Sequence, residues 1–446
     1  MNATWLSRPM DNSPLILFRI LFGALISLEC FGAIATGWVR EILVEPAFTF
    51  NFIGFNWLQF LVGPQMYVYF VVMGVLGICI SLGYRYRFCM PAFTLLWTLA
   101  YLLQKTAYNN HYYLLILLAI IMCFMPANAS HSLDVKQQRT PQNQWMPAYV
   151  KWIVVLQLFL VYSYAAIAKI YPDWTDYTFV RFLLETKADY PVVGSALQSP
   201  FMTSIVTWGG LLFDALIVPA LLWKPSRKIA FFFALIFHLF NSVVFQIGIF
   251  PFLSLALIVF FFDPAVIRKL FFKETPINTE PITKVASLKP MWIWAWVLYF
   301  IVQISLPLRH HVIPGDVLWT EEGHRMSWRM MLRARYGSVQ FEIADKDTGA
   351  RKIVDLNQML SKKQRIRIAA YPDLIWQFSQ RLAREYALAG QDVAIYADAK
   401  VSINGRPLKQ FTDPRVDLAK EDWDPFIHHH WILDSPLDEI ALEKIE

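Results

Sequence analysis

Uninterrupted apolar runs of membrane-spanning length limit what this chain can fold into. About 17–25 apolar residues in a helix cross the hydrocarbon core of a bilayer, and only helices or closed barrels satisfy their backbone polar groups there. The runs lie at about residues 15–36, 65–83, 88–104, 112–126, 148–168, 202–223, 228–247, 249–263 and 291–307. Because 112–126 and 249–263 are short, the sequence predicts a multi-pass α-helical membrane domain with eight or nine transmembrane helices.

Basic residues mark one side of this membrane domain. Lysines and arginines gather on alternate connections between the runs: Arg8, Arg85, Arg87, Lys136, Arg139, Lys224, Arg227, Lys228, Arg268, Lys269 and Lys273. Such an excess is typical of cytoplasmic loops. We therefore expect a cytoplasmic N-terminus and an extracytoplasmic location for the chain beyond residue 308.

The composition changes near residue 308 to that of a soluble domain. The segment 338–345 alternates like a strand, 372–390 has helical spacing, and 392–405 reads as a strand that ends at the hairpin signal Asn404-Gly405. The sequence predicts a membrane domain over 1–307 and a small β-rich or α+β domain over 308–446. Residues 271–290, with three prolines, are expected to form a cytoplasmic linker.

Polar side chains cluster where the topology predicts the outer ends of helices. The block KTAYNNHYYL supplies Lys105, Tyr108, Asn109, Asn110 and His111 within seven positions. Donors and acceptors at this density predict a binding or catalytic site. The alternative is an interfacial turn with a belt of aromatic residues.

Lys169 in VYSYAAIAKIYPDW closes another apolar run. An ammonium in hydrocarbon costs at least about 2.5 kcal/mol on insertion scales. The side chain either reaches the headgroups by snorkelling or serves a function. A lysine surrounded by apolar groups has a lowered pKa, so its neutral amine could act as a base.

A third polar group lies in FHLFNSVVFQIGIFPF. His238, Asn241 and Ser242 share one helix face, which predicts a lined cavity rather than a single packed histidine. A histidine and amides beside a lysine could orient an acidic substrate or stabilise a developing anion. The sequence holds no spaced set of metal ligands and no phosphate-binding loop. We therefore expect no metal and no nucleic-acid partner.

Seven segments together resemble the vitamin K-dependent γ-glutamyl carboxylase family, whose membrane part is also called the HTTM domain. They are LFRILFGALISLE, KTAYNNHYYL, AKIYPDW, FHLFNSVVFQIGIFPF, the run 307–337, IYADAKVSING (395–405) and DPRVDL (413–418). The resemblance follows the chain in order over nearly its whole length. It implies a helical membrane domain followed by a β-rich extracytoplasmic domain, in agreement with the topology above.

The resemblance also implies a chemistry. Family members oxidise vitamin K hydroquinone with O2 to the epoxide, and the strong base produced removes a γ-proton from a protein glutamate, to which CO2 then adds. Lys169 matches the family's base, and Asn110 and His111 match its asparagine–histidine pair. His238 matches a second functional histidine, with Asn241 in the same wall. Asn109, Tyr108 and Lys105 are expected to bind substrate beside them.

The chain is shorter than the animal enzymes and lacks cysteines after residue 123, which leaves its protein substrate open. The compact form resembles bacterial relatives, so we expect the cell (inner) membrane as its location and menaquinol as a possible quinone. Expected partners are the lipid bilayer, reduced vitamin K and a glutamate-bearing protein or peptide. Two alternatives remain: a quinone epoxidase with another acceptor or none, and a non-enzymatic membrane scaffold.

Overall fold

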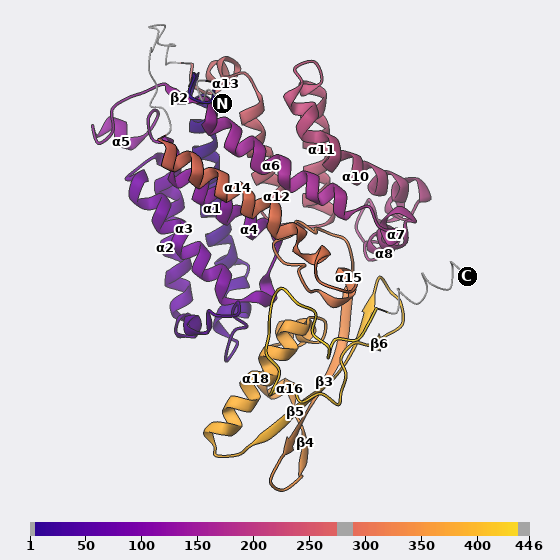
Figure 1. Ribbon diagram of the computed structural model, residues 1–446. Coiled ribbons are helices and arrows are strands. Elements are labelled where there is room, and N and C mark those ends of the chain that lie inside the picture. Colours follow the sequence, from indigo (N-terminus) through magenta and orange to yellow (C-terminus); the bar gives the residue numbers. More distant parts are fainter. Residues whose placement is uncertain (1–4, 274–288, 436–446) are drawn as a thin grey trace.

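The computed structural model describes residues 5–273 and 289–435 (Figure 1). Seven helices in these residues are long and apolar enough to cross a membrane: α1 (Ser13–Ala35), α2 (Gln65–Leu82), α3 (Tyr86–Leu103), α6 (Ala148–Ala168), α10 (Pro200–Leu222), α11 (Arg227–Val244) and α14 (Pro290–Leu308). Each coincides with a predicted apolar run. The predicted linker 271–290 lies outside the described residues apart from its two ends.

The two short runs form the two unusual helical elements. One is α4 (Asn110–Cys123), which is shorter than the others. The second run forms α12 (Phe250–Leu257) and the 3-10 helix η4 (Ile258–Phe261), followed after a 117° bend by α13 (Pro264–Phe271). Phe262 and Asp263 are extended before Pro264, since a residue before proline disfavours the helical conformation. With the bent pair as one span the count is eight, and the predicted nine also includes α4.

Close helix packing holds the first two helices together. A Cβ at Gly23 of α1 would lie 2.3 Å from the backbone nitrogen of Ser81, and one at Gly77 of α2 would lie 2.8 Å from that of Ser27. Small residues at such crossings let two backbones approach closely. Most residues of α4 are buried, and its first residue, Asn110, contacts the C-terminal domain at the carbonyl of Arg329.

Short elements connect the long helices. They are β1 (Pro9–Asp11), β2 (Trp145–Pro147), α5 (Leu133–Lys136), α7 (Pro172–Thr175), α8 (Thr178–Glu185), α9 (Gly194–Leu197), the π-helix η1 (Arg40–Val44) and the 3-10 helices η2 (Asn56–Leu61), η3 (Lys105–Ala107) and η5 (Arg309–His311). β1 and β2 pair in an antiparallel ribbon beside the start of α1. α7 and α8 follow directly after Lys169, which is the C-cap of α6.

The C-terminal domain is an antiparallel sheet covered by a helix. Its elements are α15 (Val317–Thr320), β3 (Arg335–Asp345), β4 (Arg351–Ile353), α16 (Leu356–Met359), α17 (Lys362–Ile368), α18 (Pro372–Leu388), β5 (Val393–Ile403) and β6 (Lys409–Gln410). The strand order is β4-β3-β5-β6. The predicted strands and helix correspond to β3, β5 and α18, and the turn after β5 occurs at the predicted Asn404-Gly405. The fold class predicted from the sequence is confirmed.

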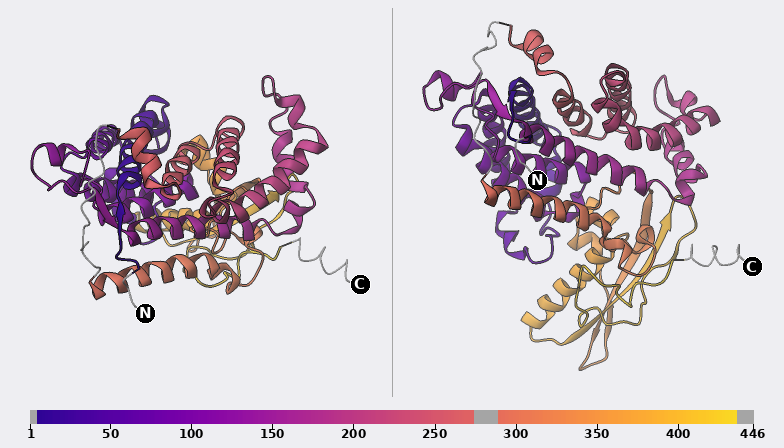
Figure 2. Two further views of the ribbon diagram at one scale, coloured as in Figure 1. Left: turned by 90° about the horizontal axis from the view of Figure 1, so that it is seen from above. Right: turned by 45° about the horizontal axis from the view of Figure 1, so that its top comes forward.

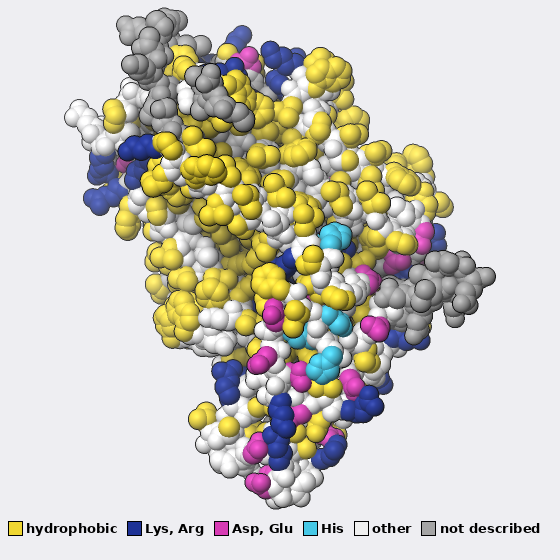
Figure 3. Space-filling model, in the orientation of Figure 1, with side chains coloured by type: hydrophobic (Ala, Val, Ile, Leu, Met, Phe, Trp, Pro, Cys, Tyr) yellow, Lys and Arg dark blue, Asp and Glu magenta, His cyan; other side chains and the backbone are white. Residues whose placement is uncertain are grey.

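The two domains pack against each other through the connection between α1 and α2. Phe48 and Phe50, from the connection between α1 and α2, belong to the apolar core of the C-terminal domain, where Phe48 stacks on Phe378. In the right view of Figure 2 this domain lies below the helices of the membrane domain. Figure 3 shows hydrophobic side chains over the helical part, whereas charged side chains gather on the C-terminal domain. The surface is thus divided as expected for a protein half embedded in lipid.

Candidate functional site

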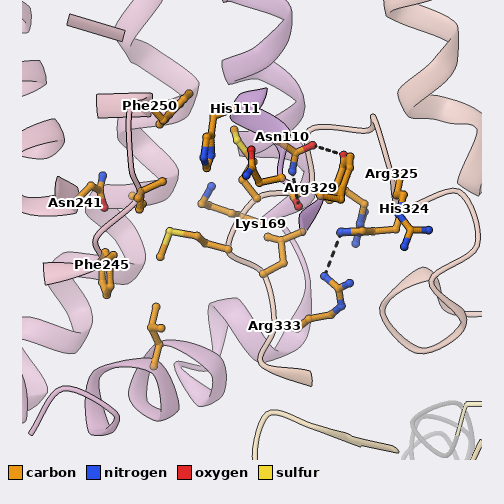
Figure 4. A pocket seen from close by; sticks show the side chains of 18 of the residues that line it. Asn110, His111, Lys169, Asn241, Phe245, Phe250, His324, Arg325, Arg329 and Arg333 are labelled. Carbon is orange, nitrogen blue, oxygen red and sulfur yellow. Dashed lines mark hydrogen bonds between the residues drawn. The ribbon is translucent and has the colours of Figure 1, made fainter. Parts of the chain in front are cut away.

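A cavity of about 310 Å³ lies where the outer ends of the helices meet residues 324–333 of the C-terminal domain. Seven of the eight residues predicted to form the site line it: Lys105, Tyr108, Asn109, Asn110, His111, Lys169 and Asn241. Figure 4 shows His111 and Lys169 pointing toward one another in this cavity, with Asn241 to one side and three arginines opposite. The eighth, His238, does not line the cavity.

Lys169 is turned into the protein. Its residue is only 6% exposed, and Nζ donates to Oδ2 of Asp214 on α10 at 2.6 Å. Nζ also lies 5.2 Å from the centre of the Trp174 ring. The snorkelling alternative is therefore wrong, because the ammonium group binds a buried carboxylate instead of reaching the surface.

Asp214 is a site residue that sequence reasoning missed. It stands alone in the apolar run 202–223 and is 7% exposed. The sequence could have revealed Asp214 through the carboxylate itself, since acidic residues inside membrane helices are rare and usually functional. Its presence changes the expectation for Lys169 from an isolated neutral amine to one member of an ion pair.

The block around His111 is organised by helix capping. Asn109 is the N-cap of α4, and its side-chain oxygen accepts from the backbone N–H of Tyr112 at 2.8 Å. Asn110 donates from Nδ2 to the carbonyl of Arg329 at 3.3 Å and accepts from the hydroxyl of Tyr108 at 2.8 Å. These bonds fix the first turn of α4, which carries His111 to the cavity.

His238 lies one side chain behind the cavity. Its Nε2 is 3.1 Å from the hydroxyl of Tyr162, and Tyr162 itself lines the cavity. Phe250 lies between the two histidines, with ring centres 6.0 Å from His238 and 6.2 Å from His111. His238 therefore reaches the cavity through side chains that line it, Tyr162 and Phe250 among them, whereas Asn241 on the same helix face lines it directly.

Lys105 belongs to a buried charged triad with residues of the C-terminal domain. Asp373 accepts from Lys105 Nζ at 2.7 Å and from Arg325 Nη1 at 2.6 Å. Burial lowers the pKa of Lys105 to about 8, although Asp373 opposes part of that shift. Burial alone would raise the pKa of Asp373, but Arg325 and Lys105 hold it at about 2. The triad connects the membrane domain to the C-terminal domain by buried ion pairs at the edge of the cavity.

Three arginines four residues apart, Arg325, Arg329 and Arg333, form a wall of the cavity that we call the arginine wall. Arg333 binds the carboxylate of Glu321. Arg329 forms no ion pair within the described residues; its Nη1 lies 3.3 Å from His310 Nε2, and burial lowers its pKa to about 10. Among the described residues Arg329 is thus the member of the arginine wall that forms no ion pair, and its guanidinium can bind a carboxylate.

His324 lies among these arginines and was not predicted. Burial, reinforced by Arg333 and Arg329, lowers its pKa well below 6.5, so its imidazole stays neutral. Apolar side chains from the membrane domain complete much of the lining: Trp174, Leu183, Val206, Phe237, Phe245, Ile247 and Phe250. The cavity thus joins an apolar half, with one ion pair, to a cationic half.

Two family profiles match the chain in sequence order. The HTTM domain matches residues 7–265, more than half of the 446 residues, and the lumenal domain of vitamin K-dependent gamma-carboxylase matches residues 288–438. The chain belongs to the vitamin K-dependent gamma-carboxylase family. The resemblance found in the sequence is thereby confirmed. No solved structure matches this gamma-carboxylase homologue.

Family membership identifies the two halves of the cavity. In this gamma-carboxylase homologue the apolar half comes from the HTTM domain, and the arginine wall comes from the lumenal domain. The protein is a membrane protein with an extracytoplasmic C-terminal region. The cavity lies between those two parts, with lining residues from both.

Proposed function

We propose that this protein is an integral-membrane enzyme that oxidises vitamin K hydroquinone, or menaquinol, with O2 and uses the base so produced to carboxylate a protein glutamate with CO2. The observation that carries the proposal is Lys169, held by Asp214 inside an apolar cavity that the arginine wall closes on the other side. A scaffold has no need of such a buried ion pair, which costs several kcal/mol to desolvate.

The residues of the cavity fit the reduced quinone. Aromatic and aliphatic side chains from the helices suit its ring and lipid tail, and Lys169 and His111 supply the polar groups for its hydroxyls. When bound, the reduced quinone supplies through its reaction with O2 the strong base that glutamate requires. All other steps depend on how the chain's own residues hold the reactants and move protons.

Lys169 and Asp214 act together in proton removal. In the resting pair the ammonium of Lys169 donates to Asp214 Oδ2. Transfer of that proton to the carboxylate frees the amine, which can then accept a proton from a substrate hydroxyl. The pair ends with one more proton than it held before: Asp214 keeps the first proton as a neutral acid, and the ammonium of Lys169 is then balanced by the oxyanion of the deprotonated hydroxyl.

The remaining residues of the cavity position the reduced quinone and stabilise the charge that develops on it. His111, carried on the first turn of α4 by Asn109 and Asn110, is placed to hydrogen-bond a developing oxyanion. Tyr108 supports Asn110, and Tyr162 transmits the position of His238 to the cavity. Asn241 faces the same space, and Lys105 fixes the rim through Asp373.

The arginine wall binds the glutamate. Arg329, which has no carboxylate partner within the described residues, can form a bidentate pair with the side chain of an acidic peptide. This gives the protein substrate an aqueous entry opposite the lipid entry of the quinone. We place the N-terminus in the cytoplasm of a cell with the protein in its inner membrane, a membrane domain over 1–307 and a lumenal domain over 308–446.

One experiment tests the proposal and its alternatives together. Membranes containing the protein receive reduced vitamin K or menaquinol, O2 and labelled bicarbonate, with and without a glutamate peptide. Epoxide together with label in the peptide is the expected result. Epoxide without label in the peptide would identify a quinone epoxidase with another acceptor or none. If no epoxide forms, the non-enzymatic membrane scaffold is the alternative that remains.

Lys169→Ala should lower epoxide formation at least about a hundredfold at normal expression, since a positioned base contributes about 10²–10⁴-fold. Small exogenous amines should restore part of the lost rate, because the substitution leaves room beside Asp214. Lys151→Ala is a matched control at the start of the same helix α6. Full activity of Lys169→Ala would contradict the assignment of Lys169 as the base.

A further inference from the structure

The hairpin turn between β5 and β6 reaches across to the membrane domain. Asp173 of α7 accepts from Arg406 through both oxygens, at 2.5 and 2.7 Å, and from Asn404 Nδ2 at 2.6 Å. Asp173 is only 7% exposed. A bidentate, buried and doubly supported carboxylate is the strong form of an ion pair.

The backbone of the turn is shaped for this contact. Asn404 and Gly405 both have positive φ, at 54° and 79°. A Cβ on Gly405 would lie 2.9 Å from Cδ2 of Phe182 on α8, so only glycine fits against that helix. The hairpin signal Asn404-Gly405 therefore serves two purposes, because it makes the turn and lets the turn dock.

The same turn also holds the arginine wall. The backbone N–H of Asn404 donates to the carbonyl of Ala334 at 2.9 Å, and its side-chain oxygen accepts from the N–H of Ala334 at 2.9 Å. Ala334 is the neighbour of Arg333. One turn thus binds the segment after Lys169 on one side and the end of the arginine wall on the other.

The segment after Lys169 is fixed at three points. The hydroxyl of Tyr171 donates to the carbonyl of Leu332, beside Arg333. Asp173 binds the hairpin turn, and Trp174 places its ring beside Lys169 Nζ while its Nε1 donates to Thr207 on α10 at 3.1 Å. Movement of this segment would carry Trp174 away from Lys169.

We propose that Asn404, Gly405 and Arg406 form a hairpin latch that positions Lys169 opposite the arginine wall by holding Asp173. The latch rests on the proposed function only in that Lys169 is the base. It couples the lumenal domain to proton removal in the membrane domain, with no disulfide, since all four cysteines are free. Asp173 and Arg406 are therefore positioning residues.

Hydrogen exchange of the purified protein in lipid nanodiscs tests the latch without reference to activity. Arg406→Ala should speed exchange at residues 169–177 about tenfold or more, although the substitution lies in the other domain. Arg406→Lys, which keeps the charge and one hydrogen bond, should give an intermediate effect. Arg415→Ala is the matched control, because its exposed guanidinium pairs only with Asp413 within the described residues.

Steady-state kinetics provide the second measurement. With Arg406→Ala, kcat for epoxide formation should fall about tenfold while KM for the hydroquinone changes less than about twofold, since misplacing a catalytic group costs rate. If Arg406→Ala does not fold, Asn404→Asp tests the same contact, because aspartate keeps the turn and repels Asp173.

The outcomes separate the latch from the proposed function. Unchanged exchange at residues 169–177 overturns the latch whatever the activity. Faster exchange with an unchanged kcat overturns its role in positioning Lys169. A wild-type protein that makes no epoxide overturns the proposed function, while the exchange result still decides whether the turn holds the Lys169 segment.

Discussion

The two walls of the cavity carry charge in different ways. On the membrane side Lys169 and Asp214 form a one-to-one pair, both nearly inaccessible to solvent. On the lumenal side Lys105 and Arg325 share the carboxylate of Asp373, Arg333 pairs with Glu321, and Arg329 forms no ion pair within the described residues. We call these the membrane wall and the lumenal wall. In the membrane wall each charge has its partner, whereas in the lumenal wall the guanidinium of Arg329 can still bind a substrate carboxylate.

The difference follows from the surroundings of each wall. An unpaired charge among membrane helices is strongly unfavourable, so a functional amine there needs a carboxylate partner. Near the aqueous domain an arginine without a partner is tolerated and can attract an anion. The membrane wall therefore suits movement of a proton within a pair, and the lumenal wall suits capture of a substrate carboxylate.

Removing the carboxylate from the membrane wall tests this comparison most severely. Asp214→Asn keeps the shape but can neither store a proton nor balance Lys169, and we expect kcat for epoxide formation to fall about 10²–10³-fold, within the range of acid–base catalysis. Asp176→Asn is the control, since Asp176 accepts from the N–H of Thr178 near the surface and asparagine can do the same. Equal activity in both variants would show that Lys169 works without its partner.

Removing the unmatched charge from the lumenal wall should affect another quantity. Arg329→Met should raise KM for a glutamate peptide about 10-fold or more, as expected for loss of a charge-assisted hydrogen bond. KM for the hydroquinone should change less. Arg384→Met, on the exposed face of α18, is the matched control. A larger effect on the hydroquinone than on the peptide would contradict the assignment of the two walls.

The smallest expected effect concerns His324 and the way in which the free energy of unfolding depends on pH. Burial and the neighbouring arginines hold its pKa in the folded protein well below 6.5. Between that low value and 6.5 the unfolded chain binds the extra proton, so stability falls as the pH drops below 6.5, by up to about 1.4 kcal/mol per pH unit.

His324→Asn should therefore reduce the fall in unfolding temperature between pH 7 and pH 5.5, measured by tryptophan fluorescence in detergent. Other groups keep their own protonation equilibria, so part of the pH dependence should remain in the variant. An unchanged pH dependence would place the sensitivity in other groups.

Local sequence signals predicted the elements and seven of the residues that line the cavity. Apolar runs gave the helices, alternation gave β3 and β5, and Asn404-Gly405 gave the turn. The dense block at Asn109–His111 was found because it interrupts two apolar runs. Asp214 was missed because a single carboxylate inside a run changes its hydropathy little, and His238 was placed in the wall although it lies behind Tyr162.

The sequence by itself determined that the chain spans a membrane, which ends of its helices carry polar groups, and which family it resembles. These properties depend on residues close together in the chain. Only the tertiary structure decided that Asp214 meets Lys169, that Asn110 meets Arg329, and that Asp173 meets Arg406. The partners in each pair are 45, 219 and 233 residues apart, and they meet only because helix crossing and domain docking bring their segments together.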